Sequence, residues 1–508
     1  MRLVTAEEMR MLDQAATKEF NIPSIVLMEN AGNALLSRAQ EMIGTVEGKK
    51  VVIFVGGGNN GGDGLVLARR LHNKGCDVRL FLTSNPDHFQ GDALTSWSSV
   101  VKLGINSQWI SDERRLDVLR VTLWSCDLIV DAIFGTGLND AVKGIIAQII
   151  QVINESAKPV LACDIPSGLC SYRGIPLGAA VEATQTVTFA YCKPGLVMPG
   201  ANAYVGKLTV ADISIPKELE DQIPVRRDLV DVNFCKHWIH PRPIDSHKGK
   251  FGHILMLAGS ELMPGAAVLA ATAAIRSGVG LLTAAIPEPC RMAFTAGLPE
   301  AMFAEPTDAE SLVKKPANCF LIGPGLGRNS EAVQLVYRLL EILEKPAVLD
   351  ADALYAVAQN KEKMKELFSK SREPFIITPH PGEMSLLTGK TVAQIQNNRI
   401  DIALEFALQY QVVVVLKGAG TVIATPTGRL FINSTGNPGM STGGTGDVLA
   451  GVIAGLLAQG LPAAIAAAVG VWIHGRAGDI AAESLHQFSL KAGDLLATIP
   501  FAFREITG

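Results

Sequence analysis

The chain has 508 residues, of which 48% are hydrophobic and 19% are charged, and its formal net charge is −4. This length exceeds what a single hydrophobic core usually serves, so we expect at least two domains. The composition excludes an intrinsically disordered chain, and the small negative charge gives no electrostatic reason to expect nucleic acid or an anionic membrane surface as a partner.

The first residues and the cysteines favour a cytoplasmic location. The chain starts with early acids and without the apolar run of a secretory signal, and Thr5 with Glu8 has the spacing of a helix capping box. The eight cysteines are scattered without a C-x-x-C pair, which is typical of free thiols in a reducing compartment. We therefore expect a cytoplasmic protein.

Short apolar runs alternate with glycine-rich loops and helix-like segments along the whole chain. In the first half these runs are Val51–Val55, Val78–Leu82, Leu128–Ile133 and Val160–Cys163. In the second half they are Ile254–Leu257, Leu281–Ile286, Cys319–Ile322, Ala347–Leu349, Phe375–Thr378 and Val412–Leu416. The pattern predicts an α/β fold with parallel sheets covered by helices on both faces.

The alternation lapses between Ile215 and His240, where prolines and charged residues replace the apolar runs. Such a stretch is typical of a connection between domains. We predict two three-layer α/β domains, one over residues 1–222 and the other over residues 223–508.

Polar, glycine-rich loops follow three predicted strands of the first half. They span Gly56–Gly64, Asp131–Leu138 and Asp164–Gly168. The carboxyl ends of parallel strands share one edge of a sheet, so we expect Asn60, Asp131 and Ser167 to meet there. One carboxylate and two neutral oxygens, with no His or Cys, suit a weakly bound monovalent cation better than zinc.

Two other interpretations of these loops stay open. Gly56, Gly58 and Gly61 satisfy the G-x-G-x-x-G pattern of a dinucleotide site, but the next predicted strand ends at Thr83 without an acid for a ribose hydroxyl. Asp63 would also bring a negative charge into a phosphate loop, and no Gly-Lys-Ser/Thr completes a Walker A motif. In a purely structural interpretation, each glycine serves a turn and each aspartate caps a helix.

The most specific motif of the second half is Gly443-Gly444-Thr445-Gly446-Asp447, ahead of a long helical stretch that we expect to begin at Val448. Backbone N–H groups at a helix start bind anions, and glycines let a phosphate approach closely. Asp447 could take a proton from a hydroxyl that faces the phosphate, although an ordinary helix cap is the alternative. Further loops at strand ends are Gly323–Gly327, Asp350–Ala353, Thr378–Glu383 and Lys417–Thr421.

The segment from Val448 to His474 carries no formally charged residue and is long enough to span a bilayer. It is rich in Ala and Gly, however, and Gln459-Gly460-Leu461-Pro462 divides it into two pieces of helical length. We predict two buried, closely packed helices here and no membrane span.

Four segments of the first half resemble the YjeF N-terminal family, which is associated with epimerising the hydrated forms of NADH and NADPH at C6 of the nicotinamide ring. They are Leu27–Gly32, Gly57–Gly64, Asp131–Gly137 and Asp164–Gly168. The resemblance implies a Rossmann-like parallel sheet and a potassium ion held by Asn60, Asp131 and Ser167. It implies that the hydrate contacts Asn59, Asn60, Gly61, Gly62, Asp63, Gly135, Thr136, Gly137, Leu138, Asn139, Asp140, Ala141 and Asp164.

We take Asp164 as the catalytic acid or base of the epimerase half. Inversion at a carbon that bears nitrogen and a hydroxyl group requires ring opening or reversible loss of water, followed by return from the other face. Either route needs one positioned proton-transfer group, and a carboxylate can serve.

The second half resembles the YjeF C-terminal family, a ribokinase-like group of dehydratases that act on the S epimer of NAD(P)H hydrate with ADP or ATP. This resemblance lies in the glycine-rich motif before Val448, in the four strand-end loops named with it, and in Asp245–Gly249. It implies contacts of the hydrate with Ala266, Gly327, His380 and the catalytic Asp447. It also implies a site for ADP, with Mg²⁺, at Lys417, Gly418, Ala419, Gly420, Thr421, Gly443, Gly444, Thr445 and Gly446.

The two resemblances together imply a metabolite-repair enzyme that epimerises NAD(P)H hydrates and dehydrates the S form at the expense of ADP, giving AMP and phosphate. The expected partners are these small molecules, in a homo-oligomer that binds neither nucleic acid nor membrane. A small-molecule kinase is one alternative, because ribokinase-like folds also phosphorylate vitamins and sugars. A non-catalytic binding module is another, although such modules tend to lose the site residues that this chain retains.

Overall fold

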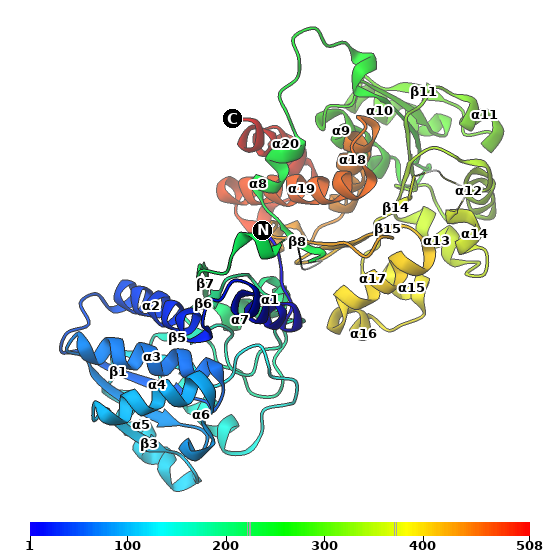
Figure 1. The fold of residues 1–508 in the computed structure, drawn as a ribbon. Helices are drawn as coiled ribbons and strands as arrows, with labels where there is room; N and C mark the ends of the chain where they lie inside the picture. The colour runs from blue at the N-terminus through cyan, green and yellow to red at the C-terminus, as the bar shows by residue number, and fades with distance from the viewer. Residues whose placement is uncertain (221, 223–224, 370, 372) are drawn as a thin grey trace. The chain divides into compact units, whose positions relative to one another are not determined.

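The computed structural model describes residues 1–220, 222, 225–369, 371 and 373–508. The chain forms two compact units, an N-terminal unit of Arg2–Val225 and a C-terminal unit of Arg226–Gly508 together with Met1. Each unit is built around its own sheet (Figure 1). Residue 223, at the boundary predicted from the sequence, lies outside the described residues.

The N-terminal unit contains a seven-stranded sheet of order β3-β2-β1-β4-β5-β6-β7, in which each pairing is parallel. The strands are β1 Lys50–Val55, β2 Asp77–Leu82, β3 Asn106–Trp109, β4 Leu128–Ala132, β5 Val160–Cys163, β6 Gln185–Phe189 and β7 Lys207–Ala211. Strands β1, β2, β4 and β5 confirm the predicted apolar runs within one residue at each end. The other three escaped prediction because polar residues interrupt them, as in Asn106-Ser107-Gln108-Trp109.

Helices cover both faces of this sheet. They are α1 Ala6–Glu19, α2 Ser24–Ile43, α3 Asn59–Asn73, α4 Gly91–Lys102, α5 Leu116–Trp124, α6 Gly144–Glu155 and α7 Asn202–Val205. Alternate residues of β1 point to opposite faces, so Ile53 packs with α1 to α4 and Phe54 packs with α5 and α6. The predicted three-layer α/β arrangement is confirmed, and the predicted capping box of Thr5 and Glu8 starts α1.

The C-terminal unit contains a ten-stranded sheet of order β11-β10-β9-β12-β13-β14-β15-β16-β17-β8. The strands are β8 Arg227–Val230, β9 His253–Leu257, β10 Leu281–Ala285, β11 Met302–Ala304, β12 Cys319–Ile322, β13 Ala347–Leu349, β14 Ile376–Ile377, β15 Val413–Leu416, β16 Val422–Ala424 and β17 Leu430–Asn433. The six predicted strands are confirmed, with β14 shorter than expected. The prediction of a wholly parallel sheet was wrong, because β16 pairs antiparallel with both β15 and β17. Short connections join these three strands, and a parallel crossover needs a longer one.

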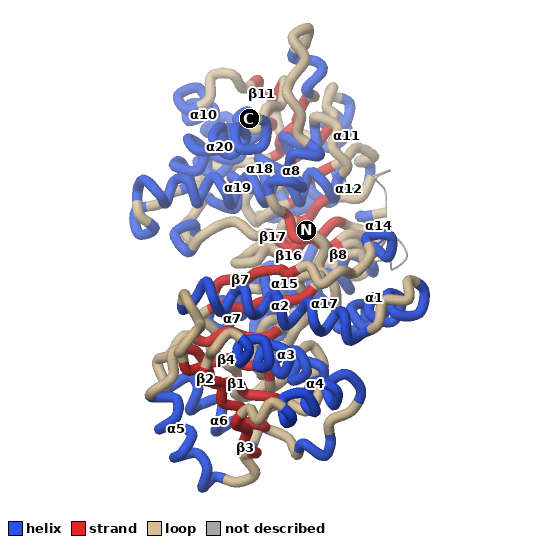
Figure 2. The backbone as a smooth tube through the Cα atoms, turned by 60° about the vertical axis from the view of Figure 1, so that its left-hand side comes forward, coloured by secondary structure: helices blue, strands red, loops and turns tan. Residues whose placement is uncertain are grey.

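Helices again form two outer layers. They are α8 Val232–Trp238, α9 Pro264–Arg276, α10 Arg291–Gly297, α11 Ala309–Lys314, α12 Ser330–Ile342, α13 Asp352–Ala358, α14 Met364–Phe368, α15 Pro381–Thr388, α16 Val392–Asn397, α17 Arg399–Tyr410, α18 Thr445–Ala458, α19 Ala463–Leu485 and α20 Ala492–Thr507. Helices α8, α9, α10, α18, α19 and α20 share one core with a face of the sheet. Figure 1 shows α12, α13, α14 and α17 on its other side, and Figure 2 shows the helical cover from a second direction.

The uncharged segment from Val448 to His474 lies within α18 and α19, which Gln459–Pro462 separates. This confirms the prediction of two buried helices. No helix in the described part of the chain combines the length and the apolar character that a membrane span requires.

Helices α9 and α18 pack closely because small residues line their contact. A Cβ atom at Gly451 would lie 2.1 Å from the Ala270 carbonyl oxygen, and one at Gly455 would lie 2.9 Å from the Ala274 carbonyl oxygen. Close packing at Gly451 sets the position of α18, which begins at Thr445 and carries Asp447 in its first turn.

We expect Gly451→Ala to lower the free energy of unfolding by about 1–3 kcal/mol, because its methyl group overlaps the α9 backbone. Gly265→Ala in α9 is the matched control, since a Cβ atom there meets nothing within 4 Å. It should be neutral or stabilise by about 0.5–1 kcal/mol, as Ala does in place of Gly within a helix. Urea unfolding of the full chain measures both, and equal effects would contradict the packing argument.

Candidate active sites

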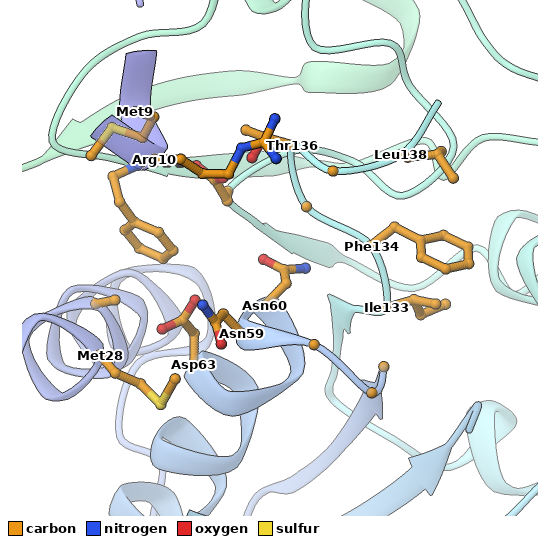
Figure 3. Close-up of a pocket in the computed structure, with 18 of the residues that line it drawn as sticks. Met9, Arg10, Met28, Asn59, Asn60, Asp63, Ile133, Phe134, Thr136 and Leu138 are labelled. Carbon is orange, nitrogen blue, oxygen red and sulfur yellow. Dashed lines mark hydrogen bonds between the residues drawn. The ribbon is translucent and has the colours of Figure 1, made fainter. Parts of the chain in front are cut away.

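The N-terminal unit holds a cavity of about 680 Å³ at the carboxyl edge of its sheet. Strands β1 and β4 are neighbours here although β2 and β3 lie between them in the sequence. The loops after two such strands diverge and leave a crevice, which is where open α/β sheets bind ligands. Figure 3 shows Asn59, Asn60 and Asp63 at the start of α3 facing Thr136 across this cavity.

Most of the residues predicted to bind the hydrate line this cavity. They are Asn59, Asn60, Asp63, Gly135, Thr136, Gly137, Leu138, Asn139, Asp140 and Asp164. Gly61, Gly62 and Ala141 are not among the lining residues, which departs from the prediction. A Cβ atom at Gly61 would lie 2.0 Å from the Gly56 carbonyl oxygen, and one at Gly62 would lie 2.5 Å from Met28 Cε. These two glycines thus let α3 begin tightly against its neighbours.

Asp164 is paired with Lys193 at one wall of the cavity. Lys193 Nζ lies 2.5 Å from Asp164 Oδ1, and the lysine side chain is only 1% exposed. The Thr188 hydroxyl and the Phe189 amide donate to the same carboxylate oxygen, at 2.9 and 3.3 Å. Because the hydrogen bonds recorded for Asp164 end on Oδ1, Oδ2 is the oxygen available to a ligand.

The backbone at Asp164 is also unusual. Its φ of +62° lies in the left-handed region, which non-glycine residues rarely occupy. Such strain costs energy and persists where the surrounding structure enforces it. Here the Ile165 amide donates to the Cys163 carbonyl at 2.8 Å, which closes a tight turn and directs the carboxylate toward Lys193.

Two more carboxyl groups lie at the cavity. Burial raises the pKa of Asp63 well above its usual range, and the nearby Asp164 carboxylate raises it further. Burial also raises the pKa of Asp13 to about 6, although Lys193 opposes this shift. Both shifts favour the neutral form of these two carboxyl groups, whereas Asp164 accepts a hydrogen bond from Lys193.

The three residues predicted to hold a cation lie in the first turn of α3 (Asn60), in β4 (Asp131) and in the loop after β5 (Ser167). The Ser167 hydroxyl donates to Asp131 Oδ1 at 2.6 Å, and its amide donates to Oδ2 at 2.7 Å. Burial raises the pKa of Asp131 to about 6 in spite of these donors. Asn60 lies beside the loop that follows Asp131, since a Cβ atom at Gly135 in that loop would be 3.3 Å from Asn60 Oδ1. Both polar atoms of the Asn60 side chain are buried and have no hydrogen-bond partner within the described chain.

The C-terminal unit assembles a second charged cluster where β13, β14 and β15 end. Lys417 Nζ lies 2.7 Å from Asp350 Oδ1 and 3.8 Å from Glu383 Oε2. Burial lowers the pKa of Lys417, but these two carboxylates more than offset it, so the pKa stays above its usual value. The Lys417 amide also donates to the Pro379 carbonyl at 2.9 Å, which joins the Lys417 loop to the His380 loop.

The start of α18 adjoins this cluster. A Cβ atom at Gly446 would lie 3.3 Å from Lys417 Nζ, whereas one at Gly443 would meet nothing within 4 Å. Gly444 has a φ of +90° and lets the chain turn into the helix. Burial and the neighbouring Asp350 carboxylate raise the pKa of Asp447 to about 7, against the opposing charge of Lys417. The helix begins three residues before the predicted Val448, so Asp447 lies inside its first turn.

Of the residues predicted to bind the dehydratase substrate, Ala266, Gly327 and His380 follow β9, β12 and β14. His380 caps α15, with Nδ1 accepting from the Gly382 and Glu383 amides, and its Nε2 lies 3.6 Å from Glu383 Oε1. The Gly327 amide donates to Asp352 Oδ2 at 2.9 Å. Ala266 lies at the start of α9, where its Cβ would be 3.0 Å from a Cβ atom at Gly325.

With both sites in place, comparison with known proteins identifies the family. A family model described as YjeF-related protein N-terminus matches residues 24–195, and one described as NAD(P)H-hydrate dehydratase matches residues 254–501. The whole chain is 43% identical to the bifunctional NAD(P)H-hydrate repair enzyme Nnr of Moorella thermoacetica and covers 97% of it. The chain belongs to the bifunctional NAD(P)H-hydrate repair enzymes. The family predicted from the motifs is confirmed.

Another member of this family, from Thermofilum pendens, is 39% identical to the chain, which covers 97% of that protein. Among solved structures, the ADP/ATP-dependent NAD(P)H-hydrate dehydratase from Bacillus subtilis, co-crystallised with ATP and Mg²⁺, is 34% identical with a TM-score of 0.51. This likeness covers 55% of the chain and 98% of the Bacillus subtilis protein. The predicted ribokinase-like fold of the second half of this repair enzyme is confirmed.

The sequence motifs did not predict several residues at the two sites of this repair enzyme. In the N-terminal unit they are Lys193 and, on α1, Arg10 and Asp13. Lys193 follows β6, a strand that the apolar pattern did not reveal, and α1 lies outside residues 24–195 of the family match. The signal that could have found Lys193 is a lysine in the otherwise uncharged run from Val187 to Val197.

Two buried basic side chains hold the backbone of the C-terminal site in place. Arg399 donates to the Leu416 and Lys417 carbonyls at 2.8 and 3.2 Å, and burial lowers its pKa to about 10. His474 Nε2 lies 2.9 Å from the Thr445 carbonyl, and burial lowers its pKa to about 4, so it donates as a neutral ring. Arg399 therefore holds the Lys417 loop, and His474 holds the first turn of α18.

Proposed function

We propose that the N-terminal cavity epimerises the hydrates of NADH and NADPH, and that the Lys417–Asp447 cluster dehydrates the S epimer with ADP. The observation that carries the first half is the Asp164–Lys193 pair at the wall of a cavity formed by the family's own motifs. Asp447 beside Lys417 at a glycine-rich helix start supports the second half.

In the proposed epimerase reaction, Asp164 transfers a proton through Oδ2. Lys193 and Thr188 hold Oδ1, so the carboxylate cannot rotate away from the ring carbon that inverts. Ring opening and reversible loss of water are both compatible with one group that takes a proton and returns it. Asp63, with its raised pKa, would supply a hydrogen bond to the departing or returning oxygen.

A potassium ion fits the loop of Asn60, because the amide oxygen of this buried side chain lacks a protein partner in the described chain. Asn60 would bind it through oxygen, with Asp131 and Ser167 supplying the negative charge and a hydroxyl oxygen. When bound, the ion supplies positive charge beside a carboxylate that burial would otherwise leave uncompensated. We assign it a positioning role at the cavity rather than a step in the reaction.

In the proposed dehydratase reaction, Asp447 takes the proton of the C6 hydroxyl as the hydroxyl oxygen attacks the terminal phosphorus of ADP. The bond from that phosphorus to the bridging oxygen breaks and AMP leaves. The amides of Gly443–Gly446 and the Lys417 ammonium are placed to stabilise the charge that develops on the phosphoryl oxygens. Elimination of the C6 phosphate, which is a far better leaving group than hydroxide, then restores the dihydronicotinamide.

We assign magnesium to the phosphates of the nucleotide. In the described part of the chain, no group of three or more His, Cys, Asp or Glu side chains is arranged to hold a metal ion. Mg²⁺ is usually held by one or two carboxylates together with substrate phosphates, and the cluster around Asp350 and Glu383 is compatible with that mode. When bound, the ion would neutralise phosphate charge.

We further propose that the enzyme works in a reducing, cytoplasmic compartment as a homo-oligomer. The eight cysteines are free thiols, and seven of them are buried, which supports the first part. The homo-oligomer stays a prediction from the sequence.

Purified full chain, incubated with ADP and the R hydrate of NADPH, should restore dihydronicotinamide absorbance faster than spontaneous epimerisation allows. Asp164→Asn keeps the side-chain shape but removes the proton acceptor, so we expect this recovery to fall by about 10²- to 10⁴-fold toward the spontaneous rate. Dehydration of the S hydrate should persist. Asp117→Asn, an exposed change on α5, is the control, and normal recovery in Asp164→Asn would reassign the base.

The pH dependence of dehydration should follow Asp447. As a base it must be unprotonated, and its pKa of about 7 predicts that kcat/KM for the S hydrate rises with pH and levels off above that value. Below it, the rate should fall by about tenfold per pH unit. Asp447→Asn should lose dehydration while retaining epimerisation, measured by chromatographic separation of the R and S hydrates. A flat profile through neutral pH would remove Asp447 as the base.

Potassium should stabilise the N-terminal unit. Replacing K⁺ by tetramethylammonium, which is too large for the Asn60 loop, should lower the free energy of unfolding by about 1 kcal/mol at K⁺ concentrations several-fold above Kd. Asn60→Ala should abolish this difference, whereas Asn106→Ala on the exposed edge strand should retain it. Equal thermal unfolding in both salts would argue against a cation at this loop.

A further inference from the structure

Helix α1 forms part of the N-terminal cavity although it precedes every motif of that site. Met9, Arg10 and Asp13 line the cavity from this helix. The helix is held in place, since Leu12 and Ala16 are buried in the core of the unit. The Val4 amide also donates to the Cys192 carbonyl at 2.9 Å, which ties the residues before α1 to the neighbour of Lys193.

The charges that line the cavity are mostly negative. The acidic residues among them are Asp13, Asp63, Asp92, Asp140 and Asp164, and the cationic ones are Arg10 and Lys193. Lys193 has no donor to spare, because its ammonium group donates to Asp164, the Thr188 hydroxyl and the Phe189 carbonyl. Among the side chains of the described lining residues, Arg10 is therefore the cation with donors open to an anionic ligand.

The Arg10 side chain is placed to meet such a ligand. Its Nε donates to the Ala6 carbonyl one helical turn earlier, at 3.3 Å, which orients the guanidinium group on α1. The side chain is exposed, and the structure records no partner for Nη1 or Nη2 within the described chain. Figure 3 shows Arg10 extending over the cavity on the side of Thr136.

We propose that Arg10 binds a phosphate group of the dinucleotide hydrate and thereby sets the affinity of the epimerase cavity for its substrate. A planar guanidinium with two free terminal nitrogens can bind two phosphate oxygens at once, whereas a lysine ammonium acts as a point charge. The substrate presents this chemistry at its pyrophosphate and, in NADPH hydrate, also at the 2′-phosphate. The inference rests on the proposed function for the identity of the substrate, while the cation and its open donors belong to the cavity itself.

Arg10→Gln in the full chain tests the proposal with three substrates: the R hydrates of NADPH, of NADH and of reduced nicotinamide mononucleotide. Loss of a charge-assisted hydrogen bond should raise KM by about tenfold. The mononucleotide keeps the nicotinamide-side phosphate, so a rise for all three substrates supports contact with that phosphate of the pyrophosphate. A rise for NADPH hydrate and NADH hydrate, but not for the mononucleotide, supports contact with the phosphate on the adenosine side. A rise for NADPH hydrate alone supports contact with the 2′-phosphate. Arg10→Lys should recover only part of the loss, because it keeps the charge without the planar fork.

Arg114→Gln is the matched control, since Arg114 is an arginine of the same unit with a 94% exposed side chain that does not line the cavity. Unchanged KM for all three substrates in Arg10→Gln would overturn the proposal, as would an equal rise in both arginine variants. Titration of NADPH fluorescence gives a second readout that needs no turnover. If the wild-type chain does not epimerise but Arg10→Gln still weakens NADPH binding relative to Arg114→Gln, the proposed function fails and the phosphate contact stands.

Discussion

A buried lysine held by an aspartate at the end of a strand is the interaction on which both sites depend. In the N-terminal unit it joins Lys193 to Asp164, and in the C-terminal unit it joins Lys417 to Asp350. A buried charge without a partner is expensive, so each pair persists only where further hydrogen bonds satisfy it, as Thr188 and Thr378 do here. Each pair thereby fixes a charged group at a candidate site.

The roles that we propose for the two pairs differ because their surroundings differ. Asp164 lies beside a cavity and is held through Oδ1, and the proposed proton transfer uses its other oxygen. Lys417 instead lies beside Gly446, and the proposed base Asp447 is a separate residue whose pKa burial raises to about 7. In the proposed reactions, the same kind of pair therefore positions an acid–base group in one unit and offers positive charge to a phosphate in the other.

The sequence predicted the two α/β halves and their apolar strands, because a buried parallel strand must be apolar on both faces. It missed strands such as β3 and β6, in which polar residues break that pattern. The motif loops were identified because glycine and aspartate cluster where a backbone must approach a ligand. Of the predicted hydrate-binding residues, Gly61, Gly62 and Ala141 do not line the cavity, because a motif does not reveal which of its glycines face a ligand and which pack against the protein.

The chain by itself determined the family, the alternation of strands and helices, and the aspartates at the strand ends, since these follow from local patterns. Only the tertiary structure brought Lys193 to Asp164, 29 residues apart, and set Arg10 over the same cavity from a helix outside the motifs. It likewise brought Arg399 to the Lys417 carbonyl and His474 to the Thr445 carbonyl at the start of α18. Such contacts depend on strand order and helix packing, which join residues that no short segment of sequence relates.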